Sequence, residues 1–346
     1  MKRGRKIWIF ITIVLIIAAV TFGIHSILKS SASEKQSDLY MESSMIKTDF
    51  CADSAYLFCY EQCEFGPRIM NSTAHDDCAE YLINKFRDYG LKVTEQDAML
   101  DGYDGTPLKV KNIIASINPD SPKRILICAH WDSRPWADND PQESNHKKPV
   151  MAANDGASGI AVMLEIARLS SVDSCFISKI KFGIDFICFD AEDWGTPQWE
   201  EEDNPDSWAL GSQYWANHPH RSGYTANFGI LLDMVGGKGA RFYREGFSDY
   251  YASGIVDKVW SVANSIGYGN YFINSRGGTV TDDHKPINEI LHIPTIDIVP
   301  YYPDCQSSSF GPTWHTTYDT MDNIDKDVLS AVGATLLEVI KNIKDE

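Results

Sequence analysis

Several catalytic signatures are absent from this sequence, and each absence argues against a class of protein. No G-x-S-x-G motif occurs, so the nucleophile turn of the common serine hydrolases is missing. No two cysteines have the C-x-x-C spacing, which argues against a zinc site built from thiolates. Residues 236–239 contain glycine and lysine without the frame of a phosphate-binding loop, so nucleotide hydrolysis has no support.

Positive charge is also scarce. The 346 residues carry 48 Asp and Glu against 31 Lys and Arg, which gives a formal net charge of −17. A surface this acidic repels nucleic acid and anionic lipid, so we expect no nucleic-acid partner. Bound cations would offset part of this negative charge.

The first residues are the exception to this acidity. Residues 1–32 hold basic residues and no acid, and residues 7–24 are uncharged and nearly all apolar. This pattern predicts an uncleaved transmembrane anchor or a signal segment, residues 1–28, followed by a flexible linker, residues 29–49. The basic flank should stay in the cytosol, which places the domain of residues 50–346 at the periplasmic face of the inner membrane. If the segment is cleaved, the domain is secreted; in both cases we expect a monomer.

The eight cysteines are compatible with an exported protein, because oxidising compartments permit disulfides. Their pairing cannot be deduced from the sequence. Cys128 and Cys188 lie inside apolar runs, so we predict that both are buried thiols.

From residue 50 onwards, apolar runs typical of strands alternate with segments of helical periodicity. Strands are expected at residues 91–98, 110–117, 124–129, 180–189, 228–235 and 293–299. Helices are expected at residues 50–64, 74–89, 160–169, 206–217, 250–266 and 328–343. Such alternation, with no internal repeat, predicts one α/β domain with a mainly parallel sheet.

The strand predicted at residues 180–189 ends on three acids, Asp190, Glu192 and Asp193. Ligands of open α/β sheets bind beyond the carboxyl ends of the strands. Buried neighbouring carboxylates are costly unless a positive group lies beside them, so we interpret this edge as a metal site. Because Glu192 and Asp193 are adjacent, one can ligate the metal while the other acts as base or acid. The alternative is a solvated acidic loop that continues into the acids at 200–203.

Other predicted strands also end in acids or histidine. His130 and Asp132, Asp233 and Asp297 belong to such strands, Asp155 opens a helix, and His315 lies in a late loop. Each has an ordinary alternative role, such as a helix cap or a packed histidine. Their shared position at one edge of a sheet favours a common site. Carboxylate and imidazole ligands without thiolate suit Zn²⁺ in a catalytic site with an open position.

A series of motifs resembles the M28 zinc exopeptidase superfamily, and within it the bacterial type of the glutaminyl-peptide cyclotransferase branch. The motifs are H-W-D at 130–132, N-D-G-A-S-G at 154–159, D-A-E-D at 190–193, L-L-D-M at 231–234 and W-H-T at 314–316. F-G-P-R at 65–68 matches the opening motif of the group, and the resemblance runs from about Glu61 to the C-terminus. Each motif alone is weak, but the set is specific. The resemblance implies a zinc exopeptidase-like fold, with a central mixed sheet flanked by helices.

The resemblance also implies roles for individual residues around one Zn²⁺ per chain. The implied zinc ligands are Asp155, Asp193 and His315. Glu192 matches the general acid/base. Asp233 and Asp282 match acids that hydrogen-bond near the reacting centre.

Two aromatic residues match the walls of the family's substrate pocket, Trp314 and, with a one-residue shift, Trp199. Two positions depart from the family pattern. Asp297 stands where animal cyclases have a pocket histidine, and Asp193 stands where many relatives have glutamate.

The implied activity is cyclisation of the N-terminal glutamine of peptides or proteins to pyroglutamate, with release of ammonia. The main alternative is a two-zinc aminopeptidase of the same superfamily, in which His130 and Asp233 hold a second metal, Asp155 bridges and Glu192 activates water. Trp314 beside His315, the triplet at 282–284 and the Trp199 region favour the cyclase. A non-enzymatic ectodomain is the third hypothesis, but no ligand or base is missing.

Overall fold

The computed structural model describes residues 50–343. The predicted N-terminal segments, residues 1–28 and 29–49, lie outside this range, as do residues 344–346. Within the described part of the chain, no helix is long and apolar enough to cross a membrane. The anchor predicted around residues 7–24 therefore stays a prediction.

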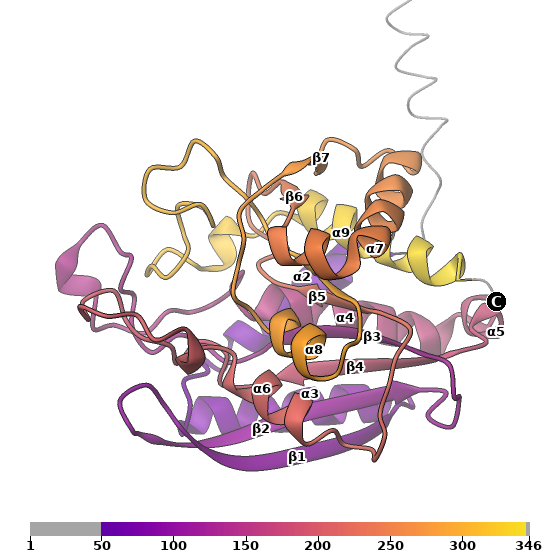
Figure 1. Cartoon of the computed structure of the whole chain (residues 1–346), viewed down its shortest axis with the longest axis horizontal. Helices are drawn as coiled ribbons and strands as arrows, with labels where there is room; N and C mark the ends of the chain where they lie inside the picture. The colour runs from indigo at the N-terminus through magenta and orange to yellow at the C-terminus, as the bar shows by residue number, and fades with distance from the viewer. Residues whose placement is uncertain (1–49, 344–346) are drawn as a thin grey trace, which may run out of the picture. The chain divides into compact units, whose positions relative to one another are not determined.

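A six-stranded mixed sheet forms the centre of the domain, with strands in the order β1-β2-β4-β3-β5-β8 (Figure 1). The strands are β1 Lys92–Asp101, β2 Pro107–Ile117, β3 Arg124–His130, β4 Gly183–Phe189, β5 Gly229–Leu232 and β8 Thr295–Ile298. Strands β4, β3, β5 and β8 run parallel to one another, whereas β2 is antiparallel to β4 and β1 to β2. The predicted α/β class with a mixed, mainly parallel sheet is confirmed.

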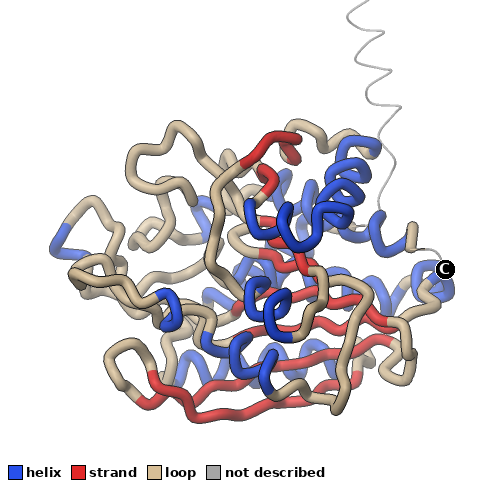
Figure 2. Tube along the Cα trace, viewed as in Figure 1, coloured by secondary structure: helices blue, strands red, loops and turns tan. Residues whose placement is uncertain are grey.

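Helices cover both faces of the sheet, which explains why the inner strands are apolar throughout. In β3, Ile125 and Ile127 belong to one buried cluster, while Leu126 and Cys128 belong to the cluster on the opposite face. Because both faces are covered, every residue of β3 and β4 is buried. Figure 2 shows the resulting layers, with helices in front of and behind the strands.

The larger cluster packs under five helices: α2 Ala52–Cys63, α3 Thr73–Asp88, α4 Ala157–Val172, α7 Gly246–Ser265 and α9 Lys326–Lys341. The smaller cluster packs under α6 Leu210–Asn217 and α8 His284–Ile290. A short helix, α5 Ser174–Lys179, leads into β4. The first and last helices of the described domain, α2 and α9, contact each other, so the two ends of the domain close together.

Two positions that interrupt the apolar run of β4, Gly183 and Asp185, lie against the side chain of Arg124. The Asp185 carboxylate is fully buried and accepts hydrogen bonds from the guanidinium of Arg124, with 2.6 Å from Nε to Oδ2, and from the Tyr224 hydroxyl at 2.8 Å. A side chain at Gly183 would overlap the same guanidinium. These interruptions therefore belong to one buried ion pair far from the strand's acidic end.

Some local predictions differ from the structure. The helix predicted at residues 206–217 begins only at Leu210, because Ala209 adopts a left-handed conformation with φ of 54°. A small parallel pair, β6 Phe242–Arg244 and β7 Phe272–Arg276, was not predicted. Every cysteine whose side chain is described is a free thiol, and Cys128 and Cys188 are buried as predicted.

Candidate active site

The predicted site residues lie where the parallel strands end. His130 closes β3, Glu192 and Asp193 follow β4, and Asp233 follows β5. Asp155 precedes α4, Asp282 precedes α8, and His315 lies in the loop before α9. Parallel strands carry their carboxyl ends to one edge, so residues distant in sequence meet there.

Left-handed backbone turns mark these strand ends. Ala191, Met234 and His315 all have φ of 53°, and Ala152 has φ of 59°. A non-glycine residue in this region costs about 1–2 kcal/mol. The sharp turns direct Glu192 and Asp233 to the same place, and they occur at the sites where the sequence shows acids or histidine.

Two groups of metal-binding side chains share Asp155. The first consists of Asp155, Asp193 and His315, whose ligand atoms all lie within 4.8 Å of one another. His315 Nε2 lies 3.2 Å from Asp193 Oδ1 and 3.6 Å from Asp155 Oδ2. The sequence-predicted ligands are thus brought together from three separate segments.

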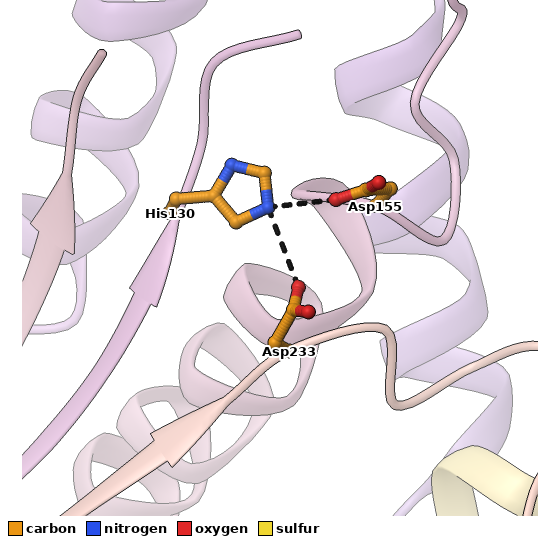
Figure 3. Close-up of side chains that lie close together, drawn as sticks. All are labelled: His130, Asp155 and Asp233. Atoms are coloured by element: carbon orange, nitrogen blue, oxygen red, sulfur yellow. Dashed lines mark hydrogen bonds and ion pairs between the residues drawn. The ribbon is translucent and has the colours of Figure 1, made fainter. Parts of the chain in front are cut away.

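The second group consists of His130, Asp155 and Asp233, shown in Figure 3. His130 Nε2 lies 3.0 Å from Asp155 Oδ1 and 3.4 Å from Asp233 Oδ1. The other ring nitrogen, Nδ1, is 3.4 Å from Asp132 Oδ1. This is the arrangement that the aminopeptidase hypothesis requires.

Asp132 and Asp190 hold the turn that presents Glu192. The Asp132 carboxylate accepts hydrogen bonds from the backbone N–H groups of Glu192 at 3.2 Å and Asp193 at 3.1 Å. Asp190 accepts from the Ala191 N–H at 2.9 Å and pairs with His75 Nε2 at 2.8 Å. Both carboxylates are buried, so the turn is fixed from beneath.

A further buried acid, Asp319, fixes the loop that carries Asp155. Its carboxylate accepts hydrogen bonds from the N–H of Asn154 at 2.8 Å and of Asp155 at 3.0 Å. Behind this loop, Gly156 has φ of 111°, and a side chain there would come 2.7 Å from the Asp132 carbonyl. Glycine is therefore required at the turn into α4.

Burial and mutual repulsion dominate the electrostatics of the site. Desolvation raises the pKa of Asp233 to about 6 and, with repulsion from Asp233, the pKa of Asp282 to about 7. Burial, despite nearby His130, raises the pKa of Glu192 well above its usual value. Burial alone would lower the pKa of His130, but the hydrogen bonds with Asp132 and Asp155 and the ionic contact with Asp233 raise it well above its usual value.

These residues fit a divalent cation. Three buried carboxylate oxygens, Asp155 Oδ2, Asp193 Oδ2 and Asp233 Oδ1, have no hydrogen-bond partner among the described residues. Buried carboxylates of this kind are costly unless a cation compensates them. Carboxylate oxygens with imidazole nitrogen are ligands that Zn²⁺ accepts in catalytic sites.

A pocket of about 300 Å³ opens directly above the first metal group. Its lining includes five predicted site residues besides the histidine ligand: Asp155, Glu192, Asp233, Asp282 and Trp314. It also includes His315, Trp208, Phe310 and the segment from Thr279 to Thr281. Trp314 stacks on His315 with ring centroids 3.7 Å apart, so the metal group and the aromatic wall form one surface.

Trp199, predicted as a pocket wall, does not line this pocket, and Trp208 takes that place. Trp199 packs against Trp136 and under the ammonium of Lys147, which lies 3.3 Å from its ring centroid. Trp208 lies nearly parallel to His315, at 5.9 Å and 8°. The sequence had assigned Trp208 to a helix, and the later start of α6 releases it to face the site.

Asp297, which the family resemblance matches to a pocket histidine of animal cyclases, is buried within β8 and is not among the pocket-lining residues. Both of its carboxylate oxygens lack a hydrogen-bond partner among the described residues. Burial and repulsion from Asp282 and Asp233 raise its pKa well above the usual value. Burial without a partner therefore favours the neutral form of this carboxyl group more than water does.

Sequence reasoning also missed Arg134 and Asp138, which lie behind the metal group. Arg134 is fully buried and donates to Asp138 and to Asp193. Asp138 Oδ1 lies 3.5 Å from His315 Nδ1. The only sequence signal was their spacing of four residues in the loop after β3, which does not reveal burial.

A comparison with known families identifies the class of protein. Residues 112–340 match the model of peptidase family M28, and the chain belongs to this family.

Within the family, the chain is similar to a glutaminyl cyclase. The crystal structure of Bacteroides thetaiotaomicron glutaminyl cyclase bound to N-acetylhistamine has 52% sequence identity and a TM-score of 0.82, and the match covers 86% of this chain and 100% of that one. A Zn-dependent exopeptidase from Parabacteroides distasonis has 49% identity and a TM-score of 0.82, over 85% of this chain and 99% of that one.

A relative outside bacteria gives a weaker match. The glutaminyl-peptide cyclotransferase of Bothrops jararaca is 26% identical over 246 residues. The match covers 65% of this chain and 63% of that protein, so the chain spans less than two thirds of its length.

Proposed function

We propose that this protein is a zinc-dependent glutaminyl-peptide cyclotransferase, which cyclises N-terminal glutamine of peptides and proteins to pyroglutamate. The observation that carries the proposal is the pocket of about 300 Å³, whose lining combines Glu192, the aromatic wall of Trp314 and Trp208, and two members of the Asp155–Asp193–His315 group, Asp155 and His315. The similarity to a glutaminyl cyclase with 52% identity supports it.

The reaction needs one proton transfer between two nitrogens. The α-amine of the substrate attacks the γ-carboxamide carbon, a C–N bond forms, and the bond to the amide nitrogen breaks to release ammonia. Glu192 accepts the proton from the α-amine and delivers it to the departing nitrogen. Its partly buried position at the pocket and its raised pKa suit a group that must both take and give a proton.

The remaining pocket residues orient the substrate. Asp233 would hydrogen-bond the departing nitrogen, with Asp282 behind it; both line the pocket, which supports these roles. Trp314 and Trp208 confine the glutamine side chain so that its carboxamide lies near its own amine. Because the ring closure is intramolecular, such confinement supplies much of the rate enhancement.

Asp155, Asp193 and His315 would hold one zinc ion. When bound, it would supply Lewis-acid polarisation of the substrate carboxamide. Outside catalysis, the ion would offset the negative charge that the buried acids concentrate at this edge of the sheet.

The second metal group supports an alternative function, a two-zinc aminopeptidase. His130, Asp155 and Asp233 lie close enough to bind another ion (Figure 3), and the similar Parabacteroides distasonis protein is described as a Zn-dependent exopeptidase. In that chemistry a second metal would capture the free α-amine, which would block its use as a nucleophile. The two functions therefore require different numbers of metal ions.

Metal stoichiometry combined with two substrates separates the functions. We expect one zinc per chain, ammonia release from Gln-peptides, and no hydrolysis of a leucine anilide. His130→Ala should keep the single zinc. Two zinc ions in the unmodified protein, one of them lost in His130→Ala, together with leucine release, would establish the aminopeptidase instead.

The N-terminal segment and the assembly state complete the proposal. We propose an extracytoplasmic enzyme that acts as a monomer and is held at the membrane by residues 7–24, or secreted if this segment is cleaved. The run of uncharged apolar residues supports this. Membrane fractionation of the full chain and a deletion of residues 1–28 test it.

A further inference from the structure

Arg134 is the one guanidinium in the described domain that contacts a predicted metal ligand through its side chain. Its side chain is fully buried. Nη1 donates to the Asp193 carbonyl at 3.1 Å and to Asp193 Oδ1 at 3.3 Å. On the other side, Nε and Nη2 donate to the two oxygens of Asp138 at 2.8 Å and 2.6 Å.

The contact between Arg134 and the Asp193 carboxylate involves only one of its two oxygens. Oδ1 accepts the hydrogen bond from Arg134 and also lies 3.2 Å from His315 Nε2, whereas the buried Oδ2 has no partner among the described residues. A carboxylate tied at one oxygen cannot rotate freely about its side chain, so the second oxygen keeps a fixed direction. The Arg134 contact therefore favours binding of a cation through a single oxygen of Asp193.

The contact with Asp138 extends the same control to His315. Asp138 Oδ1 lies 3.5 Å from His315 Nδ1, an ionic contact rather than a formed hydrogen bond, while the opposite nitrogen, Nε2, faces Asp193 and Asp155. A carboxylate behind a metal-binding histidine fixes the orientation of its ring. Because Arg134 binds both oxygens of Asp138, one guanidinium sets the positions of two predicted ligands.

The plane of the guanidinium is itself held by aromatic rings. Its central carbon lies 4.7 Å from the ring centroid of Trp208 and 5.4 Å from that of Trp136. Trp208 lines the substrate pocket, so Arg134 connects the pocket wall with the metal group. A lysine would keep the charge but has neither the planar face nor the paired donors that this position uses.

We propose that Arg134 is a positioning residue of the metal centre, which fixes Asp193 directly and His315 through Asp138 so that the zinc-binding arrangement exists before the ion binds. The inference rests on the ligand set of the proposed function. The inference goes beyond the proposed function because it assigns part of the zinc affinity to Arg134 and Asp138, which are outside the predicted ligand set.

Arg124 offers a matched control, because it forms the same kind of pair elsewhere. Arg124 is buried in β3, and its guanidinium binds both oxygens of Asp185 in the neighbouring strand β4. No residue of the two metal groups contacts it in the described structure. Arg124→Lys therefore reports the general effect of weakening a buried arginine–aspartate pair.

The test compares zinc affinity by chelator competition in the full-length variants Arg134→Lys, Asp138→Asn and Arg124→Lys. We expect Arg134→Lys and Asp138→Asn each to bind zinc about 10–100-fold more weakly, as residues behind metal ligands do. The double variant should be little weaker than Arg134→Lys alone, because Asp138 acts on His315 within the chain of contacts that Arg134 holds. Arg124→Lys should bind zinc within about twofold of the unmodified protein. Thermal unfolding of the metal-free variants measures stability separately.

Two results would overturn the proposal. One is unchanged zinc affinity in both Arg134→Lys and Asp138→Asn; the other is an equal loss in Arg124→Lys. If Arg134→Lys does not fold, Asp138→Asn carries the same test. Asp193→Ala and His315→Ala separate this failure from that of the proposed function: if they also retain zinc, the ligand set itself is wrong.

Discussion

Glu192 is the residue whose chemistry the proposed reaction depends on most directly. Glu192→Gln keeps the size and the hydrogen-bonding capacity of the side chain but cannot move a proton, so kcat should fall by about 10²–10⁴. The zinc content should not change, because Glu192 is not in the Asp155–Asp193–His315 group. Ammonia release and metal analysis measure both. Glu80→Gln, at an exposed position on α3, is the control, and near-normal turnover of Glu192→Gln would remove Glu192 from the mechanism.

Trp208 and Trp199 form a matched pair, because one lines the pocket and the other does not. Trp208→Ala should raise KM about tenfold or more, since an aromatic wall contributes about 0.5–1.5 kcal/mol beyond its buried area. Trp199→Ala should leave KM within about twofold, because its ring contacts Trp136 and Lys147 instead. Steady-state kinetics with one Gln-peptide measure KM for both variants. A larger effect at Trp199 would contradict the assignment of the wall.

At the scale of residues, the sequence predicted side chains that are costly to bury unless they have a function. The acids after β4 and β5 and the late histidine were found in this way, and the structure brings Asp155, Asp193 and His315 together. Their roles stay proposals. Residues with an ordinary alternative were missed: Arg134 resembles any loop arginine until its burial is known, and Trp208 resembles a helix residue until Ala209 is seen to turn the chain.

The packing of α4 on the sheet provides a test at the scale of elements. A Cβ at Gly159 would overlap the Leu232 carbonyl oxygen and come 2.8 Å from Ala129 Cβ. Gly159→Ala should therefore reduce the free energy of unfolding by about 1–3 kcal/mol, as overpacking does. Denaturant unfolding measures it. Gly254→Ala in α7 is the control: nothing lies within 4 Å, so the better helix propensity of alanine should leave stability equal or higher.

The segment after α6 contains a partly buried histidine, His220, whose titration should change stability with pH. Trp215 Nε1 donates to His220 Nδ1 at 3.2 Å, and burial lowers the pKa of His220 from 6.5 to about 4. The folded state then binds fewer protons than the unfolded state between these values, so stability should fall as pH drops from 6.5 to 4. His220→Phe should flatten this part of the stability curve, measured by denaturant unfolding at several pH values. An unchanged slope would show that His220 does not titrate there.

Elements were predictable where their periodicity was long and uninterrupted. Strand β4 and helices α3 and α9 lie within a few residues of their predicted bounds. The pair β6 and β7 was missed because three to five residues are too few to show a period. Only the strand order, which no local pattern encodes, places β5 beside β3 and so brings Asp233 next to His130.

The charge of the whole chain should influence which peptides the enzyme takes. The net charge is −17, and Asp203 at the pocket is continuous with the exposed acids at 200–202. A peptide with lysine after the N-terminal glutamine should show a higher kcat/KM than one with glutamate, with glycine between them. Raising the salt concentration should reduce the difference, because salt screens surface charge. Equal kcat/KM for all three peptides at low salt would contradict this.

The hydrogen bond from the Asp155 N–H to Asp319 joins positions 164 residues apart. Contacts of such long range close late, because the chain between them must already be ordered. A nascent chain whose residues beyond Trp314 are still inside the ribosome has neither His315 nor Asp319, so the Asp155–Asp193–His315 group cannot yet assemble. The rate at which refolding protein binds a coloured divalent ion such as Co²⁺ should therefore report how fast the C-terminal third docks.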